Sequence, residues 1–267
     1  MPDAFLESSA LIELVFRHRE VQRKVESACP LGGRRLTSRY VLFEIARGYL
    51  LSLLVLQNKA RAVGGLRELR QYMHSGQQLF KTCRRETMLA AYEDFLAHLE
   101  ALGIAFTEEQ RLPHFRGWLS QHVRHGWRRL TRVAEAINPV GCREDIPAPA
   151  QKANGLYEQP LPTQECGLPT ACGLDRCLSS YHADFKAAAE ALAALESPDA
   201  ETQRRVVAVR SLLARNAGAD FAGKHCWSSG DAIICHEAPV DATIVTKNRK
   251  HFEPLCAVFG RTLSTYV

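Results

Sequence analysis

The stretch Trp227–Phe252, WSSGDAIICHEAPVDATIVTKNRKHF, has the pattern of a helix, a turn and a short strand. Its two serines can cap a helix whose first turn holds Asp231, and Pro239 ends that helix. The β-branched residues 243–246 predict a strand, which runs into a polar loop. Ligands of α/β proteins bind beyond the carboxyl ends of parallel strands, so the stretch predicts a site of that kind.

The beginning of the chain has a similar pattern, in which a short strand is followed by an acidic residue and a helix. Residues 4–6 predict a short strand that ends at Glu7 and leads into a helix. After a predicted loop over Cys29–Arg35, Thr37 or Ser38 can cap a helix in which Glu44 lies among apolar residues. A carboxylate on an apolar stripe needs a partner, because burying a lone charge is costly. Glu7 taken by itself also fits a solvated acid at a helix start.

The composition indicates a water-soluble protein with a sizeable core. The chain has 267 residues, of which 46% are hydrophobic, and its net charge is +5. This mild positive charge permits a polyanionic partner without requiring one. We expect no membrane span, because no apolar run reaches about 18 residues. Nine scattered cysteines and the lack of a basic leader favour a reducing, cytoplasmic location.

The middle of the chain has a helical pattern from residue 50 to residue 137, and Pro113 and Gly117 are expected to separate its last helix. Residues 111–132 hold six arginines, three histidines and no acid. Arginine pairs with phosphate and an aromatic face stacks a base, so this helix is a candidate RNA surface. The alternative is a solvated basic face with core tryptophans. The candidate RNA-binding residues here are Arg116, Trp118, Arg124, Arg128, Arg129 and Arg132.

A proline- and cysteine-rich segment occupies residues 139–177. Four cysteines that bracket a loop with little core of its own can bind structural Zn²⁺. Their spacing differs from the usual Cys-x₂-Cys knuckle, and buried free thiols are the alternative. The candidate zinc ligands are Cys142, Cys166, Cys172 and Cys177.

The order of these elements resembles the PIN-domain nucleases. The matching stretches are FLESSALI with Glu7, SRYVLFEIARG with Glu44, GDAII with Asp231 and IVTKNRKHF with Asn248. The resemblance implies a three-layer α/β fold with a small parallel sheet, formed by residues 1–56 and 221–267. Residues 57–220 would then be a large, mainly helical insertion.

The same resemblance implies a metal-dependent ribonuclease. Glu7, Glu44 and Asp231 would converge on Mg²⁺ or Mn²⁺, because clustered carboxylates repel one another without a cation. Thr246 and Asn248 would orient the attacking water. Lys247, Arg249 and Lys250 are the further candidates for binding the RNA backbone.

Two departures from the family pattern keep another function open. The first acid is usually Asp and here is Glu7, and Asn248 stands where a fourth acid is common. These departures favour, as the alternative, a catalytically impaired PIN-like module for RNA binding or assembly. A toxin neutralised by a cognate inhibitor protein is a third reading, which the long insertion weakens. A homo-oligomer and the choice between Mg²⁺ and Mn²⁺ are left open.

Overall fold

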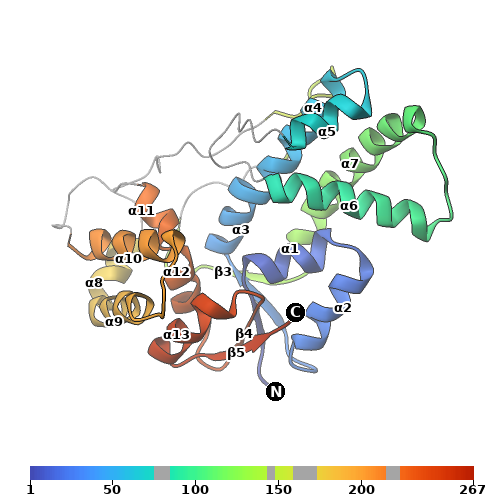
Figure 1. Cartoon of the computed structure of the whole chain (residues 1–267). Coiled ribbons are helices and arrows are strands. Elements are labelled where there is room, and N and C mark those ends of the chain that lie inside the picture. Colours follow the sequence, from blue (N-terminus) through green and yellow to red (C-terminus); the bar gives the residue numbers. More distant parts are fainter. Residues whose placement is uncertain (75–84, 143–147, 159–172, 215–222) are drawn as a thin grey trace.

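A five-stranded parallel sheet forms the centre of the protein (Figure 1). The computed structural model describes residues 1–74, 85–142, 148–158, 173–214 and 223–267. Within them the strand order is β3-β2-β1-β4-β5, and every pairing is parallel. The predicted α/β class with a small parallel sheet is therefore confirmed. The strands are β1 (Ala4–Leu6), β2 (Arg35–Ser38), β3 (Glu135–Ile137), β4 (Thr243–Thr246) and β5 (Thr262–Thr265).

Strands β1 and β4 have the bounds that the sequence predicts. The other three strands were not expected, and β2 begins at Arg35, the last residue of a predicted loop. These strands carry few apolar residues, and β3 and β5 lie at the two edges of the sheet. Their pairing with neighbouring strands, rather than a local pattern, makes them strands.

The helices of the described chain cover the sheet and extend beyond it. Helix α1 contacts β1 and β4, and α13 contacts β5, an arrangement compatible with three layers. In Figure 1, α4 to α7 reach away from the sheet at the upper right, and α8 to α11 gather at the left. The helices are α1 (Ser8–Phe16), α2 (Arg19–Ala28), α3 (Arg39–Ile45), the π-helix η1 (Ala46–Leu50), α4 (Leu51–Ala62), α5 (Leu66–His74), α6 (Arg85–Ala101), α7 (Glu108–Leu130), α8 (Gly173–Ser180), α9 (His182–Ala193), α10 (Ala200–Leu213), α11 (Gly223–Ser228), α12 (Gly230–Glu237) and α13 (Arg249–Phe259).

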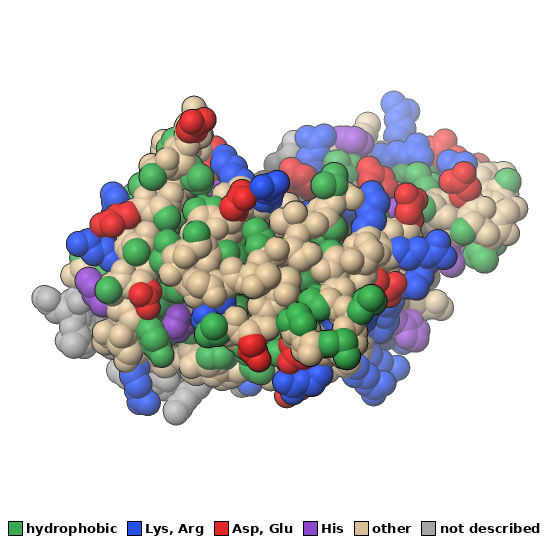
Figure 2. Space-filling view, turned by 90° about the horizontal axis from the view of Figure 1, so that it is seen from below, with side chains coloured by type: hydrophobic (Ala, Val, Ile, Leu, Met, Phe, Trp, Pro, Cys, Tyr) green, Lys and Arg blue, Asp and Glu red, His purple; other side chains and the backbone are tan. Residues whose placement is uncertain are grey.

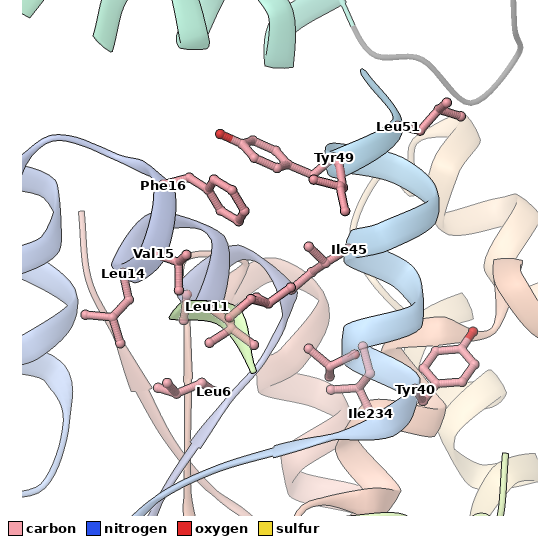
Figure 3. Close-up of a cluster of buried hydrophobic side chains, with 14 of the residues drawn as sticks. Leu6, Leu11, Leu14, Val15, Phe16, Tyr40, Ile45, Tyr49, Leu51 and Ile234 are labelled. Carbon is pink, nitrogen blue, oxygen red and sulfur yellow. The ribbon is translucent and has the colours of Figure 1, made fainter. Parts of the chain in front are cut away.

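The apolar core joins α1 to the helical run that follows β2. Phe16 at the end of α1 lies against Tyr49 of η1, with ring centroids 4.9 Å apart (Figure 3). Helix α7 approaches the same ring closely, since a Cβ atom on Gly126 would lie 2.0 Å from a carbon of Phe16. Any larger residue at position 126 would therefore push α7 away from α1.

Helices α3, η1 and α4 form one continuous run from Arg39 to Ala62. Among the described residues, this is the one run that is long and apolar enough to cross a membrane. Its most apolar window is 78% buried inside the protein, as in the core helix of a soluble domain.

The middle of the chain differs from its prediction in two respects. Helix α7 runs unbroken through Pro113 and Gly117, which were expected to separate helices. Pro113 lies in the second turn of α7, where it removes one helical hydrogen bond, and the buried side chains of Leu112 and Phe115 hold the helix across it. In addition, the expected boundary after residue 56 falls inside α4, and β3 joins the sheet although it lies within 57–220. The middle segment is thus tied to the sheet.

Candidate carboxylate site

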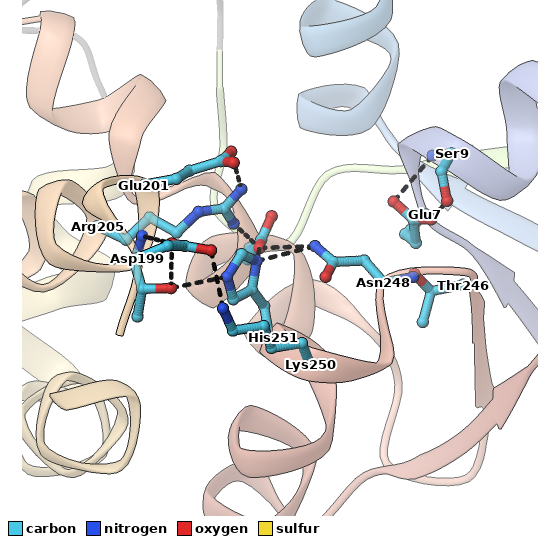
Figure 4. Close-up of polar contacts among 11 residues, drawn as sticks. Glu7, Ser9, Asp199, Glu201, Arg205, Thr246, Asn248, Lys250 and His251 are labelled. Carbon is cyan, nitrogen blue, oxygen red and sulfur yellow. Dashed lines mark hydrogen bonds and ion pairs between the residues drawn. The ribbon is translucent and has the colours of Figure 1, made fainter. Parts of the chain in front are cut away.

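Glu7 follows β1 and is the N-cap of α1. Its carboxylate accepts hydrogen bonds from the backbone N–H groups of Ser9 at 2.9 Å and Ala10 at 3.2 Å, and from the Ser9 hydroxyl (Figure 4). Burial raises the pKa of Glu7, and the nearby Glu44 adds to this, whereas hydrogen bonds from Ser9 and Thr246 lower it. Glu7 is therefore a buried, well-satisfied cap of the helix.

Glu44 lies on α3, which begins directly at the carboxyl end of β2. The hydroxyl of Ser38 caps this helix by accepting from the Val41 N–H at 3.1 Å, as the sequence predicts. The Glu44 carboxylate accepts a hydrogen bond from the hydroxyl of Ser8, the residue before Ser9. Two consecutive serines thus connect Glu44 and Glu7 at one edge of the sheet.

Asp231 lies in the first turn of α12 and is 8% exposed. The guanidinium of Arg205, from α10, forms an ion pair with its carboxylate. Asn248 donates from Nδ2 to the same carboxylate at 3.4 Å, and Nδ1 of His251 lies 3.4 Å away (Figure 4). Burial lowers the pKa of His251, and the charge of Arg205 lowers it further. Arg205 is therefore the cationic partner of Asp231 at neutral pH.

Thr246, the last residue of β4, and Asn248 form the turn in which this strand ends. The hydroxyl of Thr246 accepts from the Asn248 N–H at 2.8 Å, and the Asn248 amide lies 3.0 Å from Nδ1 of His251. Thr246 is fully buried and also contacts the Glu7 carboxylate. This turn consequently links the surroundings of Glu7 with those of Asp231.

A cavity of about 320 Å³ opens beside Glu44 and Asp231. Its walls come from α3 and η1 on one side, from α10 on another and from α11 and α12 on a third. Glu7 is not among the described residues that line it. The lining residues are Tyr40, Phe43, Glu44, Arg47, Gly48, Glu201, Arg204, Arg205, Trp227, Ser228, Gly230 and Asp231.

The described residues do not bring the three expected acids into one metal-binding group, and their convergence on a cation stays a prediction. Within the described residues, no three His, Cys, Asp or Glu side chains are grouped so that they could hold a metal ion. Glu44 and Asp231 nevertheless face one cavity and offer the hard oxygen atoms that Mg²⁺ and Mn²⁺ prefer. Mg²⁺ commonly takes one or two carboxylates together with water and substrate phosphate, so this pair fits it.

No family model, curated protein or solved structure matches this chain. The interpretation of the site therefore rests on its own residues. Among these, Arg205 and Trp227 were not assigned a role from the sequence. Neither stands in a motif, and Arg205 belongs to a segment that the sequence places in an insertion, far from Asp231 along the chain.

The three cations expected to hold the RNA backbone after β4 are all paired with carboxylates. Lys247 contacts Glu13, Arg249 contacts Glu253 at 2.9 Å, and Lys250 contacts Asp199 at 2.8 Å. Exposed pairs of this kind are weak, so phosphate can compete for Arg249 and Lys250. Lys247 is a weaker candidate, because its partner Glu13 is buried.

The candidate RNA-binding residues on and just after α7 differ in whether they make structural contacts. Arg116 donates to the carbonyl groups of Ala60 and Val63 at 2.6 and 2.7 Å, and Arg129 donates to that of Leu14 at 3.0 Å. Trp118 packs against Phe95, Phe115 and His122. Structural contacts thus involve these residues, and their expected RNA role stays a prediction. The exposed candidates are Arg124, Arg128, Arg129 and Arg132.

We expect Arg116→Ala to lower stability by roughly 3 kcal/mol, since each charged hydrogen bond contributes about 1.5–3 kcal/mol. The melting temperature should fall by about 6 °C or more, measured by differential scanning calorimetry. Arg128→Ala is the matched control, because Arg128 is exposed on the same helix. Equal melting temperatures for the two variants would show that Arg116 does not hold α4 against α7.

The structure describes two of the four proposed zinc ligands. Cys166 and Cys172 lie outside the described residues. Cys142 is partly exposed and Cys177 is buried. Burial, with the charge of Glu237, raises the pKa of Cys177 to about 11. Val140 and Gly173 lie in contact, so the described residues that contain Cys142 and Cys177 come close together there. The zinc site stays a prediction, to be checked by metal analysis of protein purified without chelator.

Proposed function

We propose that this protein is a PIN-like ribonuclease that depends on Mg²⁺ or Mn²⁺. The observation that carries the proposal is the position of Glu44 and Asp231, which come from distant parts of the chain and line one cavity. That cavity adjoins the carboxyl ends of the central parallel strands, where α/β proteins commonly bind ligands. The five-stranded parallel order and the PIN-like sequence stretches support the same family.

Each polar residue of the site has a role in this proposal. Glu44 and Asp231 hold the divalent cation, and Ser8 orients Glu44 through its hydroxyl. Asn248 and His251 orient Asp231 through their contacts with its carboxylate. Glu7 fixes the start of α1 and so keeps Ser8 in place. A bound Mg²⁺ or Mn²⁺ activates a water molecule and stabilises negative charge on the phosphate.

Arg205 gives the site a cation of its own. Its guanidinium pairs with Asp231 and, at 2.7 Å, with Glu201. An arginine in this position neutralises Asp231 in the absence of metal and can pass to a phosphate of the RNA when metal binds. The proposal therefore predicts competition between Arg205 and the divalent cation.

The Arg205 contact is also what favours the second candidate function. If the guanidinium holds Asp231 permanently, the acids do not bind metal and the protein serves as an RNA-binding or assembly module. The neutral Asn248 beside Asp231 gives the site less negative charge than a fourth acid would, which also favours this second function. A cognate inhibitor protein and a homo-oligomer are partners compatible with either candidate.

The exposed arginines of α7 are the proposed path for RNA outside the cavity. Arg124 and Arg128 lie one turn apart on the same face of α7, and Arg132 follows just beyond the end of the helix. By contrast, Figure 2 shows the molecule from below, the side on which the chain begins, where Lys and Arg are interspersed with Asp and Glu. Mixed charge of this kind attracts a polyanion less than a stripe of one sign does.

We expect Arg205→Gln to bind Mn²⁺ at least about tenfold more tightly than the wild type, because it removes a like charge beside the metal. Without metal the variant should melt at a lower temperature, since Asp231 loses its partner in a buried position. Titration calorimetry and thermal melting with and without Mn²⁺ measure both effects. Arg210→Gln, at an exposed position on the same helix, is the control. Unchanged Mn²⁺ affinity in Arg205→Gln would show that Arg205 does not compete with the metal, whereas no Mn²⁺ binding by either protein would favour the non-catalytic module.

Cleavage of a mixed pool of single-stranded and structured RNA tests the function itself. We expect cleavage with Mn²⁺ that stops on addition of a chelator. Equal background with and without Mn²⁺, from protein that melts cooperatively, would reject the nuclease and leave the binding module.

A further inference from the structure

We propose that the cavity beside Glu44 and Asp231 binds one nucleotide of single-stranded RNA, adjacent to the phosphodiester that is cut. The base would stack on the Trp227–Arg47 pair, and Arg204 would hold a phosphate. This inference rests on the proposed function and adds to it a substrate form and a set of recognition residues.

The helix that forms one wall of the cavity changes its winding there. Arg47 and Gly48 line the cavity and belong to η1, the π-helical turn in an otherwise α-helical run. Such single π-turns are frequent at functional sites. Apart from its chain neighbours and the backbone of its own helix, no described atom lies within 4 Å of the place where a Cβ atom of Gly48 would stand. The wall at Gly48 is therefore bare, and a side chain added there would project into open space.

The cavity offers a surface on which a base can stack. Trp227 is partly exposed and lines the cavity, with the guanidinium of Arg47 over its ring. Tryptophan rings and guanidinium planes both stack on nucleic-acid bases. Phe43 and Tyr40 are buried beneath, and the Tyr40 hydroxyl donates to the Cys226 carbonyl at 2.7 Å. These two aromatic residues thus form a fixed apolar floor.

The charges of the cavity leave one cation for a phosphate. Three carboxylates line it, Glu44, Asp231 and Glu201, and so do three arginines, Arg47, Arg204 and Arg205. Arg47 lies over the Trp227 ring and Arg205 is paired with Asp231, so a phosphate fits best at Arg204. Arg204 is exposed, and its Nε donates to the Ala200 carbonyl at 3.1 Å, while no carboxylate in the described chain forms an ion pair with it. Arg204 can therefore accept the phosphate.

The volume of the cavity limits the ligand to one nucleotide. At about 320 Å³ it lies near the lower end of the range for small-molecule pockets, which is about 300–1,000 Å³. Further nucleotides of the strand would continue outside the cavity.

Binding of adenosine and guanosine 5′-monophosphate, measured by titration calorimetry in the presence of chelator, tests the pocket without any cleavage. The test variant is Gly48→Leu, which fills the bare wall and leaves every charged residue in place. We expect it to weaken binding about fivefold or more, because even weak base stacking on an aromatic side chain contributes about that factor. The matched control is Gly117→Leu, at an exposed helical glycine of α7 with open space around it.

Mn²⁺-dependent RNA cleavage by the same variants separates this inference from the proposed function. If the wild type cleaves RNA but binds no nucleotide at millimolar concentration, or if Gly48→Leu binds as the wild type does, the pocket is rejected and the nuclease stands. If nucleotides bind and Gly48→Leu prevents binding, the pocket is supported even when no RNA is cut. Thermal melting of each variant verifies that it folds.

Discussion

Asp231→Asn should lower kcat/KM for Mn²⁺-dependent RNA cleavage by about 100-fold or more. Metal coordination contributes several kcal/mol to stabilising charge in a transition state, and each 1.4 kcal/mol or so corresponds to about tenfold in rate. Asparagine keeps the size of the side chain and an acceptor for Arg205, so it removes mainly the charge. Single-turnover cleavage of one defined RNA at saturating Mn²⁺ gives the measurement.

The matched control for this variant is Asp241→Asn, the same substitution at an exposed position four residues after the end of α12. It should cleave RNA at the wild-type rate. Melting temperatures of both variants exclude unfolding as the cause of lost activity. Cleavage by Asp231→Asn at more than about a third of the wild-type rate would contradict the role of Asp231 as a metal ligand, since such a loss is under 1 kcal/mol.

Glu237→Gln should raise stability at pH 8 by roughly 3 kcal/mol. Glu237 is 1% exposed, and neither carboxylate oxygen has a hydrogen-bond partner of normal geometry among the described residues. Burial raises the pKa of its carboxyl from 4.5 to about 7, although Ser38 and the Val140 N–H lie near enough to lower it slightly. Each unit of pKa corresponds to about 1.4 kcal/mol of preference for the neutral form, which glutamine supplies permanently.

The raised pKa of Glu237 makes the free energy of unfolding depend on pH. Between pH 4.5 and about 7 the folded protein keeps the Glu237 proton that the unfolded chain has released. The free energy of unfolding therefore falls as pH rises through this window, and the contribution is lost above it. Glu237→Gln should remove this part of the pH dependence, so that its advantage is small near pH 4.5 and largest at pH 8.

Calorimetric melting at pH 5 and pH 8 checks the prediction. We expect the melting temperature of Glu237→Gln at pH 8 to exceed that of the wild type by about 6 °C or more. The control is Glu196→Gln, at an exposed position, which should melt as the wild type does at both pH values. A lower melting temperature for Glu237→Gln at pH 8 would mean that its charge is stabilised by a partner.

The amino-acid sequence determined the local parts of this protein. Strands β1 and β4, the cap by Ser38 and the placement of Glu44 and Asp231 on helices follow from apolar spacing, β-branched residues and capping preferences. These signals act over a few residues and are therefore readable from one chain. They also predict that the ends of the parallel strands gather the polar residues at one edge.

Tertiary structure decided which of these residues meet. Arg205 and Asp231 pair because α10 packs beside α11, the helix that directly precedes α12, and no local pattern encodes this packing. Packing also buried Glu7 as a helix cap and turned Arg116 toward the carbonyl groups of Ala60 and Val63. Helix caps depend on neighbours in sequence, whereas the edge strands and the partner of a charge depend on the segment that folds against them.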